Sequence, residues 1–342
     1  MNAFRKYWYV VAQSDDLRDA PLAAVVLGES FVVWRQHDGQ PVAMADRCLH
    51  RLARLSSGRS SDGVLQCGYH GWCYDGSGRV CRVPSAGSDE GRRRPRCSPP
   101  FASCECDGYV YVRLDPESGA LGDAAPLPMP HWNEPGWGHV RLVNRFAGNV
   151  ADCIENFIDV PHTAFVHRGV FRDSRGERIQ ATVVRSAGRV HVRYRGEQSN
   201  LGPWTWFLNP RRTPVEHEDN YIRPNITCVR YRLGNGYGFV ITSQAVPIDE
   251  RNTLVYTDLA YRFGCFTRLA APFVRRAGQK VIDQDLAILA EQGEVIAAHG
   301  RRFSVSPPDL IHRCVDDIRR AIARGDDPHG LPDKTFDIEF FV

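Results

Sequence analysis

Two cysteines and two histidines lie in a pair of short segments that share one pattern. Cys48 and His50 are separated by one residue, and Cys67 and His70 are separated by two. Each half offers one thiolate and one imidazole, and two such loops can wrap a single metal centre. The residue types fit a zinc site with two cysteines and two histidines. They also fit a two-iron, two-sulfur cluster with both cysteines on one iron and both histidines on the other.

The distribution of ligands between the two halves favours the cluster. A zinc finger usually keeps its two cysteines in one half and its two histidines in the other, whereas here each half is mixed. Gly71 and Trp72 predict a tight loop with an aromatic lid beside the second half. Four other cysteines near these segments fall outside the ligand pattern and are expected to be free thiols: Cys73, Cys81, Cys104 and Cys106.

A second group of metal-type residues lies in ENFIDVPHTAFVH, residues 155–167. Asp159 and His162 are three residues apart and share one face of a helix. His162 and His167 are five apart, about 140° around an ideal helix, so they need a distortion to bind one ion. Pro161 can supply it, because proline removes a backbone donor and clashes with the preceding turn. Two histidines and a carboxylate from elsewhere would form the facial triad of non-haem Fe(II) oxygenases.

The third ligand is expected on a predicted helix over residues 268–300, where Asp283 and Asp285 are the acidic candidates. Both motifs together resemble the Rieske non-haem iron oxygenases. The string CGYHGW from Cys67 looks like that family's second cluster loop, and CLHR from Cys48 looks like its first. The acidic residue followed by Ile-Leu and Gln is similar to the family's third ligand, which favours Asp285 over Asp283.

The resemblance also implies roles for two residues close to the iron. In the family, an aspartate three residues before the first iron-binding histidine links the two metal centres. Asp159 would therefore accept hydrogen bonds from His162 and from His70 of a neighbouring subunit, and such carboxylates fix imidazole orientation. Asn156 matches a polar residue near the iron. The family's cluster-to-iron path runs between subunits, so a head-to-tail homotrimer is expected.

The fold class predicted from the pattern is α+β with two domains. Short apolar strands fill the first third, and an Asp-Gly hairpin turn follows FVVWRQ. A Pro- and Gly-rich stretch, residues 115–137, separates the two predicted domains. We therefore assign residues 1–125 to an all-β Rieske [2Fe-2S] domain, with the cluster loops over residues 46–72. Residues 126–342 would form a catalytic domain, an antiparallel sheet over about 170–265 flanked by helices in a helix-grip-like arrangement. Its substrate pocket is expected among these strands, with aromatic and polar candidates at Trp204, Trp206, Phe207 and Asn209.

Composition excludes several classes of partner. The formal net charge of +3 over 342 residues gives no reason to expect nucleic acid or an anionic membrane. The longest apolar runs are far too short to span a membrane, and the first residues lack the apolar core of a signal peptide. Eleven cysteines, an odd number, favour reduced thiols and metal ligands in the cytoplasm over a disulfide framework.

The two motifs fit one reaction. Activating O2 at Fe(II) requires electrons that one iron cannot store, and a one-electron cluster nearby would supply them. No G-x-G-x-x-G unit or flavin fingerprint is evident, so electrons from NAD(P)H would come through a separate reductase, directly or by way of a ferredoxin. We therefore expect a terminal oxygenase that hydroxylates or demethylates a small or medium organic substrate. Ring dihydroxylation, oxygenation at nitrogen or sulfur, an electron-transfer protein with a partner-binding C-terminal domain, and a zinc-stabilised module stay open as alternatives.

Overall fold

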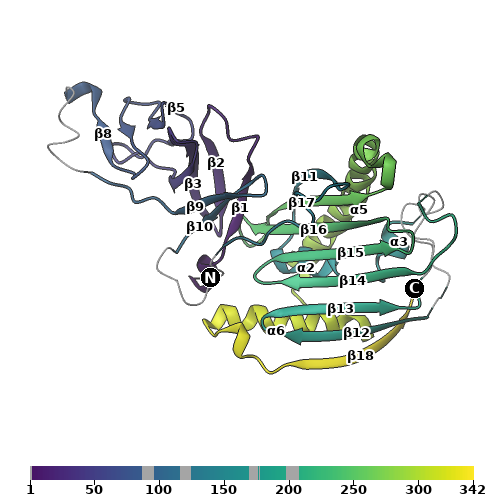
Figure 1. Cartoon of the computed structure of the whole chain (residues 1–342). Coiled ribbons are helices and arrows are strands. Elements are labelled where there is room, and N and C mark those ends of the chain that lie inside the picture. The colour runs from purple at the N-terminus through teal and green to yellow at the C-terminus, as the bar shows by residue number, and fades with distance from the viewer. Residues whose placement is uncertain (1, 87–95, 116–124, 169–175, 177, 198–207) are drawn as a thin grey trace. The chain divides into compact units, whose positions relative to one another are not determined.

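The computed structural model describes residues 2–86, 96–115, 125–168, 176, 178–197 and 208–342 (Figure 1). Contacts along the chain divide it into two units, Met1–Pro128 and Met129–Val342, which are described separately. This division falls in the Pro- and Gly-rich stretch where the sequence analysis assigns the boundary to residue 125.

The first unit is built from three small antiparallel sheets. Their strand orders are β1-β10-β9, β2-β3-β4 and β5-β6-β7-β8. The strands are β1 (Tyr9–Gln13), β2 (Leu22–Val26), β3 (Glu29–Arg35), β4 (Pro41–Ala45), β5 (Arg59–Ser61), β6 (Val64–Gln66), β7 (Cys73–Tyr74), β8 (Val80–Arg82), β9 (Ala102–Cys106) and β10 (Tyr109–Arg113). Two 3-10 helices, η1 (Asn2–Lys6) and η2 (Pro84–Ala86), complete it. The predicted all-β first domain is confirmed.

The predicted Asp-Gly hairpin joins β3 to β4. Gly39 has a φ of +82°, a conformation that glycine adopts without a steric penalty. Across the two strands, Val32 pairs with Met44 and Trp34 pairs with Val42. All four side chains are buried and belong to the core that also contains both cluster-loop cysteines. The core of this unit therefore continues into the loops that carry the metal-type residues.

The second unit is organised around one eight-stranded antiparallel sheet with the order β11-β17-β16-β15-β14-β13-β12-β18 (Figure 1). Its strands are β11 (Gly138–Phe146), β12 (Arg178–Ser186), β13 (Arg189–Arg195), β14 (Val215–Ile222), β15 (Ile226–Leu233), β16 (Gly238–Pro247), β17 (Thr253–Arg262) and β18 (Lys334–Phe341). The predicted sheet over about 170–265 is thus correct in type but too narrow. The edge strands β11 and β18 lie outside that range in the sequence. The prediction missed them because the pairing of an edge strand depends on contacts with distant segments, which the local sequence pattern does not show.

Helices pack against this sheet. They are α2 (Val150–Phe157), α3 (Thr163–Val166), α5 (Thr267–His299) and α6 (Leu310–Arg324), with 3-10 turns η3 (Gly264–Phe266), η4 (Pro307–Asp309) and η5 (Pro328–Gly330). In α6 the buried residues recur at helical spacing: Ile311, Cys314, Val315, Ile318, Ala321 and Ile322. The helix ends at Gly325, which adopts the left-handed conformation at φ +86°.

The long helix α5 approaches the sheet closely at Gly278. A Cβ atom at this position would lie 2.5 Å from Leu259 Cδ1 on β17, so a larger residue would require the Leu259 side chain to move. Asp285 lies seven residues further on, which is about two helical turns and therefore the same face. The glycine thus helps to hold the Asp285 side of α5 against the inner face of the sheet.

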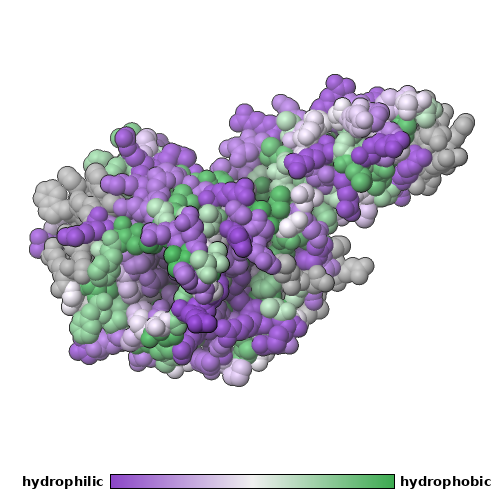
Figure 2. Space-filling model, turned by 180° about the vertical axis from the view of Figure 1, so that it is seen from behind, coloured by the Kyte–Doolittle hydropathy of each residue, from purple (hydrophilic) through white to green (hydrophobic). Residues whose placement is uncertain are grey.

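The face of the molecule in Figure 2 is mostly hydrophilic, with smaller hydrophobic patches between the polar side chains. Within the described ranges, the structure contains no helix with both the length and the apolar character needed to cross a bilayer.

Candidate metal centre and substrate cavity

A break between two helices positions both histidines of the second motif. Helix α2 begins after Asn149, whose side chain accepts a hydrogen bond from the Ala151 N–H at 2.9 Å. The helix ends at Phe157, and α3 resumes the helical path only at Thr163. Pro161 lies in the break, as predicted, and His162 and His167 flank the single turn of α3.

The break brings the two imidazoles together with an aspartate of α5. His162 Nε2 lies 3.6 Å from Asp285 Oδ1, and His167 Nε2 lies 3.3 Å from the same oxygen. The three potential ligand atoms all lie within 4.8 Å of one another. His167 and Asp285 are buried, with exposed fractions of 3% and 6%. The residue types and their spacing fit a 2-His-1-carboxylate iron site.

The outer nitrogen of each imidazole is held by a second side chain. His162 Nδ1 lies 3.1 Å from Asp159 Oδ2, and His167 Nδ1 lies 3.1 Å from Gln284 Oε1. Burial opposes ionisation of Asp159, but its hydrogen bonds from His162 outweigh this and lower the pKa of the carboxyl. Both contacts turn Nε2 toward Asp285, the orientation needed for metal binding. Gln284 was missed in the sequence analysis, although its position next to Asp285 was a signal.

Asn156 also reaches the acidic residue. Its Nδ2 donates to Asp285 Oδ1 at 3.4 Å, and its Oδ1 is buried and has no hydrogen-bond partner among the residues that the structure describes. A buried unpaired oxygen is costly, so its position next to the triad points to a ligand or ordered water there. By contrast Asp283 is exposed and accepts a hydrogen bond from Gln279 at 2.8 Å. The geometry therefore places Asp285, and not Asp283, beside the two histidines.

We expect Asp159→Asn to lower the iron occupancy or the turnover rate by about 10–100-fold, as removal of an orienting carboxylate does at other metal sites. The asparagine side chain can turn its NH2 group toward His162 Nδ1, and the carboxylate oxygen that holds the His162 ring through a hydrogen bond is then lost. Metal analysis and steady-state turnover would measure the effect. Gln284→Leu should also lower the iron occupancy or the turnover rate, because it removes the side chain that holds His167. Normal iron content and normal turnover in both variants would contradict the assigned contacts.

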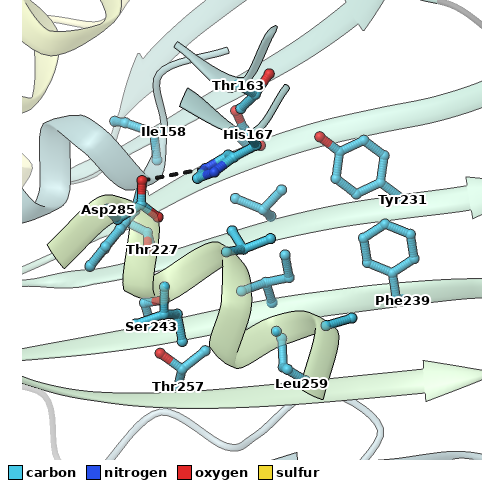
Figure 3. Close-up of a pocket in the computed structure, with 18 of the residues that line it drawn as sticks. Ile158, Thr163, His167, Thr227, Tyr231, Phe239, Ser243, Thr257, Leu259 and Asp285 are labelled. Atoms are coloured by element: carbon cyan, nitrogen blue, oxygen red, sulfur yellow. Dashed lines mark ion pairs between the residues drawn. The ribbon is translucent and has the colours of Figure 1, made fainter. Parts of the chain in front are cut away.

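A cavity of about 260 Å³ lies between the sheet and α5 and includes the triad in its wall. Figure 3 shows His167 and Asp285 on one side and Tyr231 and Phe239 across from them, on neighbouring strands. The α5 residues in the wall recur at helical spacing: Val274, Ala277, Gly278, Val281, Ile282 and Asp285. Most of the lining is apolar, and Thr227, Ser243 and Thr257 add hydroxyl groups. Such a cavity suits a small organic molecule.

Of the four residues expected to line the pocket, only Asn209 lies in the part of the chain that the structure describes, and it is not among the residues that line this cavity. Trp204, Trp206 and Phe207 lie outside the described residues. Asn209 is described, and it organises its own loop: its Nδ2 donates to the Thr213 carbonyl at 2.8 Å, and its Oδ1 accepts from the Thr213 N–H at 3.0 Å.

A second polar group in the cavity wall is a histidine clamped by two carboxylates. His217 Nδ1 lies 2.6 Å from Glu197 Oε1, and His217 Nε2 lies 2.9 Å from Asp219 Oδ1. The Tyr194 hydroxyl donates to the other oxygen of Asp219 at 2.9 Å. His217 has no ligand spacing to another histidine or cysteine in the sequence, and it is not among the predicted site residues. The alternation in VEHEDN on β14 was the available signal, because it puts His217 and Asp219 on one face.

The clamp makes His217 a buried cation at neutral pH. Burial alone would favour the neutral ring, but the charges of Asp219 and Glu197 outweigh it and raise the pKa to about 9. Because the folded pKa lies above the ordinary value of 6.5, the stabilisation is fully present below about pH 6.5 and is lost as the pH rises through about 9.

We expect the wild-type protein to lose about 3 kcal/mol of this stabilisation between those two pH values. His217→Gln has no such titration, so its unfolding midpoint should fall less steeply over the same range. Thermal unfolding of both proteins at closely spaced pH values would measure the difference. Parallel curves would show that His217 is not a clamped cation.

In the first unit, the four residues of the first motif lie in two loops that close on each other. Cys48 and Cys67 are buried, and His70 is exposed. The His50 ring lies 4.5 Å from the His70 ring between centroids and stacks on Trp72 at 4.9 Å. The predicted aromatic lid is therefore present.

Hydrogen bonds hold these loops in place. The Cys67 N–H donates to the Trp72 carbonyl at 2.9 Å, and the Gly71 N–H donates to the Cys67 carbonyl at 3.1 Å. The Tyr74 hydroxyl lies 3.2 Å from Cys48 Sγ. Burial and the neighbouring Cys67 thiol raise the pKa of Cys48. The His50 Nδ1 is buried and has no hydrogen-bond partner in the described part of the chain, as expected for a nitrogen that binds a metal.

Two family models match the chain. The Rieske [2Fe-2S] domain matches residues 7–97, and the vanillate O-demethylase oxygenase C-terminal domain matches residues 146–313. The first range contains all four residues of the cluster motif, and the second contains the triad.

Named relatives include plant and bacterial oxygenases. The chloroplastic pheophorbide a oxygenase of Oryza sativa subsp. japonica is 33% identical over 49% of this chain and 34% of its own length. The oxygenase component of dicamba O-demethylase of Stenotrophomonas maltophilia is 29% identical over 63% of each chain. The methylxanthine N1-demethylase NdmA of Pseudomonas putida is 34% identical over 49% of each chain. The alignments thus span about a third to two-thirds of these relatives.

Solved structures share the whole fold. Dicamba monooxygenase bound to dicamba matches with a TM-score of 0.80 and 20% identity, over 94% of this chain and 98% of that chain. The NdmA QL mutant of Pseudomonas putida with theobromine matches with a TM-score of 0.76 and 21% identity, over 98% and 97%. A Rieske domain and an oxygenase C-terminal domain in this order, which together match most of the chain, show that it belongs to the Rieske non-haem iron oxygenases, which use a [2Fe-2S] cluster and a mononuclear iron.

Proposed function

We propose that the protein is the terminal oxygenase component of a Rieske monooxygenase system. It uses O2 and externally supplied electrons to hydroxylate or demethylate a small or medium organic substrate. The observation that carries this proposal is the cavity whose wall contains the His162, His167 and Asp285 triad, in a chain that also has a Rieske domain. An electron carrier alone would have no use for a mostly apolar cavity beside a second metal-type site.

In this proposal the triad holds the mononuclear iron through His162 Nε2, His167 Nε2 and the Asp285 carboxylate. Three ligands on one face leave positions open for O2 and substrate, and the bound Fe(II) supplies the chemistry of oxygen activation. Asp159 and Gln284 fix the two rings through Nδ1. The apolar walls bind the substrate and exclude water. Asn156, which contacts Asp285, tunes the open side of the site.

The Cys48, His50, Cys67 and His70 side chains hold the [2Fe-2S] cluster. Two buried thiolates and two imidazoles are the ligand set that such a cluster takes. Tyr74 contacts Cys48 Sγ, and a hydrogen bond to a ligand sulfur is one of the factors that set a cluster's reduction potential. Held there, the cluster would supply one-electron storage for the oxygenase reaction.

We expect a homotrimer in which electrons pass between chains, as the family resemblance implies, and Asp159 supports transfer between chains. Its Oδ2 accepts both hydrogen bonds from His162, so Oδ1 remains for an imidazole of a neighbouring subunit. His70 is exposed and suits that role. Exposed apolar side chains also surround the cluster loops, with Leu52 at 72% and Tyr69 at 66% exposure, and they favour burial at a protein contact.

The electron donor is an NAD(P)H-dependent reductase, with or without a ferredoxin. The reductase or ferredoxin would dock near the cluster loops, because His70, a predicted cluster ligand, is exposed at the surface of these loops. Cysteines without disulfides, all eleven of them, support a location in the cytoplasm. The named relatives that demethylate dicamba and methylxanthines favour demethylation or hydroxylation over ring dihydroxylation.

The test combines purified protein, a surrogate reductase and a panel of methylated and aromatic compounds. We expect substrate-dependent O2 uptake, formaldehyde release with N-methyl or O-methyl compounds, and label from isotopic O2 in hydroxylated products. A protein that contains iron and reducible cluster but consumes no O2 with any compound would contradict the oxygenase. A cis-diol as the main product would replace monooxygenation with dihydroxylation.

A further inference from the structure

An arginine and a predicted cluster ligand lie against the same tryptophan in the first unit. The His50 ring is nearly parallel to the Trp72 ring, with 4° between the two planes and 4.9 Å between the two centroids. The guanidinium carbon of Arg96 lies over the Trp72 ring, 4.9 Å from its centroid. A cation at this distance is attracted to the electron-rich face of an indole. Trp72 therefore connects a positive charge to the proposed ligand set.

The backbone around Arg96 is fixed in the sheet beside the second cluster loop. The Val80 N–H donates to the Arg96 carbonyl at 2.9 Å, and Arg79 and Cys97 form a β-bridge. Val80 begins β8, and its side chain belongs to the same buried core as Trp72. The position of the Arg96 side chain over the indole thus follows from the fold of this unit.

The Arg96 guanidinium has no partner to neutralise it. Its Nη1 is buried and finds no hydrogen-bond acceptor, and Arg96 forms no ion pair, among the residues that the structure describes. Arg35 of the same unit shows the usual arrangement, with its NH1 nitrogen 2.7 Å from a Glu105 carboxylate oxygen. An unpaired cation that is partly removed from water is costly. Such a charge acts strongly on any group nearby that changes its own charge.

The group beside Arg96 that changes its charge is the [2Fe-2S] cluster. Reduction by one electron from the reductase or ferredoxin makes the cluster more negative by one charge, and net charge is one of the factors that set its potential. A unit charge at about 10 Å, with an effective dielectric constant of about 20, shifts a one-electron equilibrium by about tenfold. The two contacts through Trp72 place Arg96 within this range of His50. Arg51 has the same sign but is exposed, so water and salt weaken its effect.

We propose that Arg96, held over Trp72, raises the reduction potential of the [2Fe-2S] cluster through its positive charge. The charge stabilises the reduced cluster, so the external donor can reduce it more easily. Arg96 acts through space and binds neither iron nor substrate. This inference rests on the proposed cluster ligands and adds a residue that sets the potential of the cluster they hold.

Spectroelectrochemical titration of the purified full-length protein, with its cluster loaded, tests the role of the charge. Arg96→Gln removes the charge, and Arg96→Lys keeps it. We expect Arg96→Gln to lower the ratio of reduced to oxidised cluster about tenfold at a fixed solution potential, which is a shift of about 59 mV for one electron. Arg96→Lys should stay close to the wild type. No shift in Arg96→Gln, or the same shift in both variants, would overturn the proposal.

Arg113→Gln is the matched control. The guanidinium carbon of Arg113 also lies 4.9 Å from the centroid of a tryptophan ring, that of Trp8, and its Nε is buried without a hydrogen-bond partner in the described ranges. Arg113 is on β10, whose sheet is separate from the one that contains β6, β7 and β8 around the second cluster loop. The potential of Arg113→Gln should match that of the wild type. An equal decrease in Arg96→Gln and Arg113→Gln would show an effect of total charge and contradict a local role for Arg96.

A second neutral variant separates the charge from the packing. Arg96→Met keeps an apolar side chain against Trp72, so it should lower the potential as Arg96→Gln does. The visible spectrum of each preparation reports its cluster content. Wild-type protein without a reducible cluster would overturn the proposed cluster ligands themselves. A normal cluster with an unchanged potential in both neutral variants would overturn only the role of Arg96.

Discussion

We expect Asp285→Ala to contain no mononuclear iron and to lose more turnover than the 10–100-fold that removal of an orienting carboxylate costs. The substitution removes the only carboxylate that the structure places within 4.8 Å of both His162 and His167 ligand atoms, within the described residues. The cluster lies in the other unit of the chain, so its visible spectrum should be unchanged. Iron analysis, the visible spectrum and O2 uptake on one preparation would measure all three effects.

Asp283→Ala is the matched control for this prediction. Asp283 is on the same helix, two residues away, but it is exposed and bonded to Gln279. Its removal takes away the same charge without touching the triad, so iron content and turnover should match those of the wild type. Loss of iron in Asp283→Ala with normal iron in Asp285→Ala would reverse the assignment of the third ligand.

The second large effect is expected from Cys67→Ser. A serine oxygen is a poor replacement for a thiolate in a [2Fe-2S] cluster, so the protein should lose its visible absorption and acid-labile sulfide. Reductase-driven turnover should then fall to background, because no electron can reach the mononuclear iron. The triad does not depend on Cys67, so about one iron per chain should remain after reconstitution.

Cys73→Ser provides the comparison. Cys73 is six residues further along and also buried, but its Sγ donates to the Gly71 carbonyl at 3.2 Å, a bond that a serine hydroxyl can replace. Cluster content and turnover should be unaffected. Equal loss of the cluster in both variants would mean that Cys67 acts through folding of the loop and not as a ligand.

The two metal motifs were visible in the sequence because each depends on local spacing. Pro161 between two candidate ligands indicated a helix break, and the structure has one there. The choice of Asp285 over Asp283 required family resemblance, since both lie on one helix, and which of them faces the sheet depends on how the helix packs against distant strands.

Other features depended on contacts between distant segments. Gln284 meets His167 across 117 positions in the chain, and Glu197, two residues beyond the end of β13, meets His217 on β14. The local signals at Gln284 and His217 do not identify these distant partners, so neither pair was found. The edge strands β11 and β18 were missed for the same reason. The alternation of apolar and polar residues was enough to predict that a segment is a strand. The order in which the strands pair could be read only from the folded sheet.

Two kinds of iron are required in one chain. The most direct test is Mössbauer spectroscopy, applied to protein that is enriched in the Mössbauer isotope of iron and reduced under anaerobic conditions. We predict about two-thirds of the signal from a reduced two-iron cluster with unequal sites and about one-third from a single high-spin Fe(II) with nitrogen and oxygen ligands. A spectrum of cluster iron alone, in protein loaded with Fe(II), would leave the triad without a metal and contradict the account.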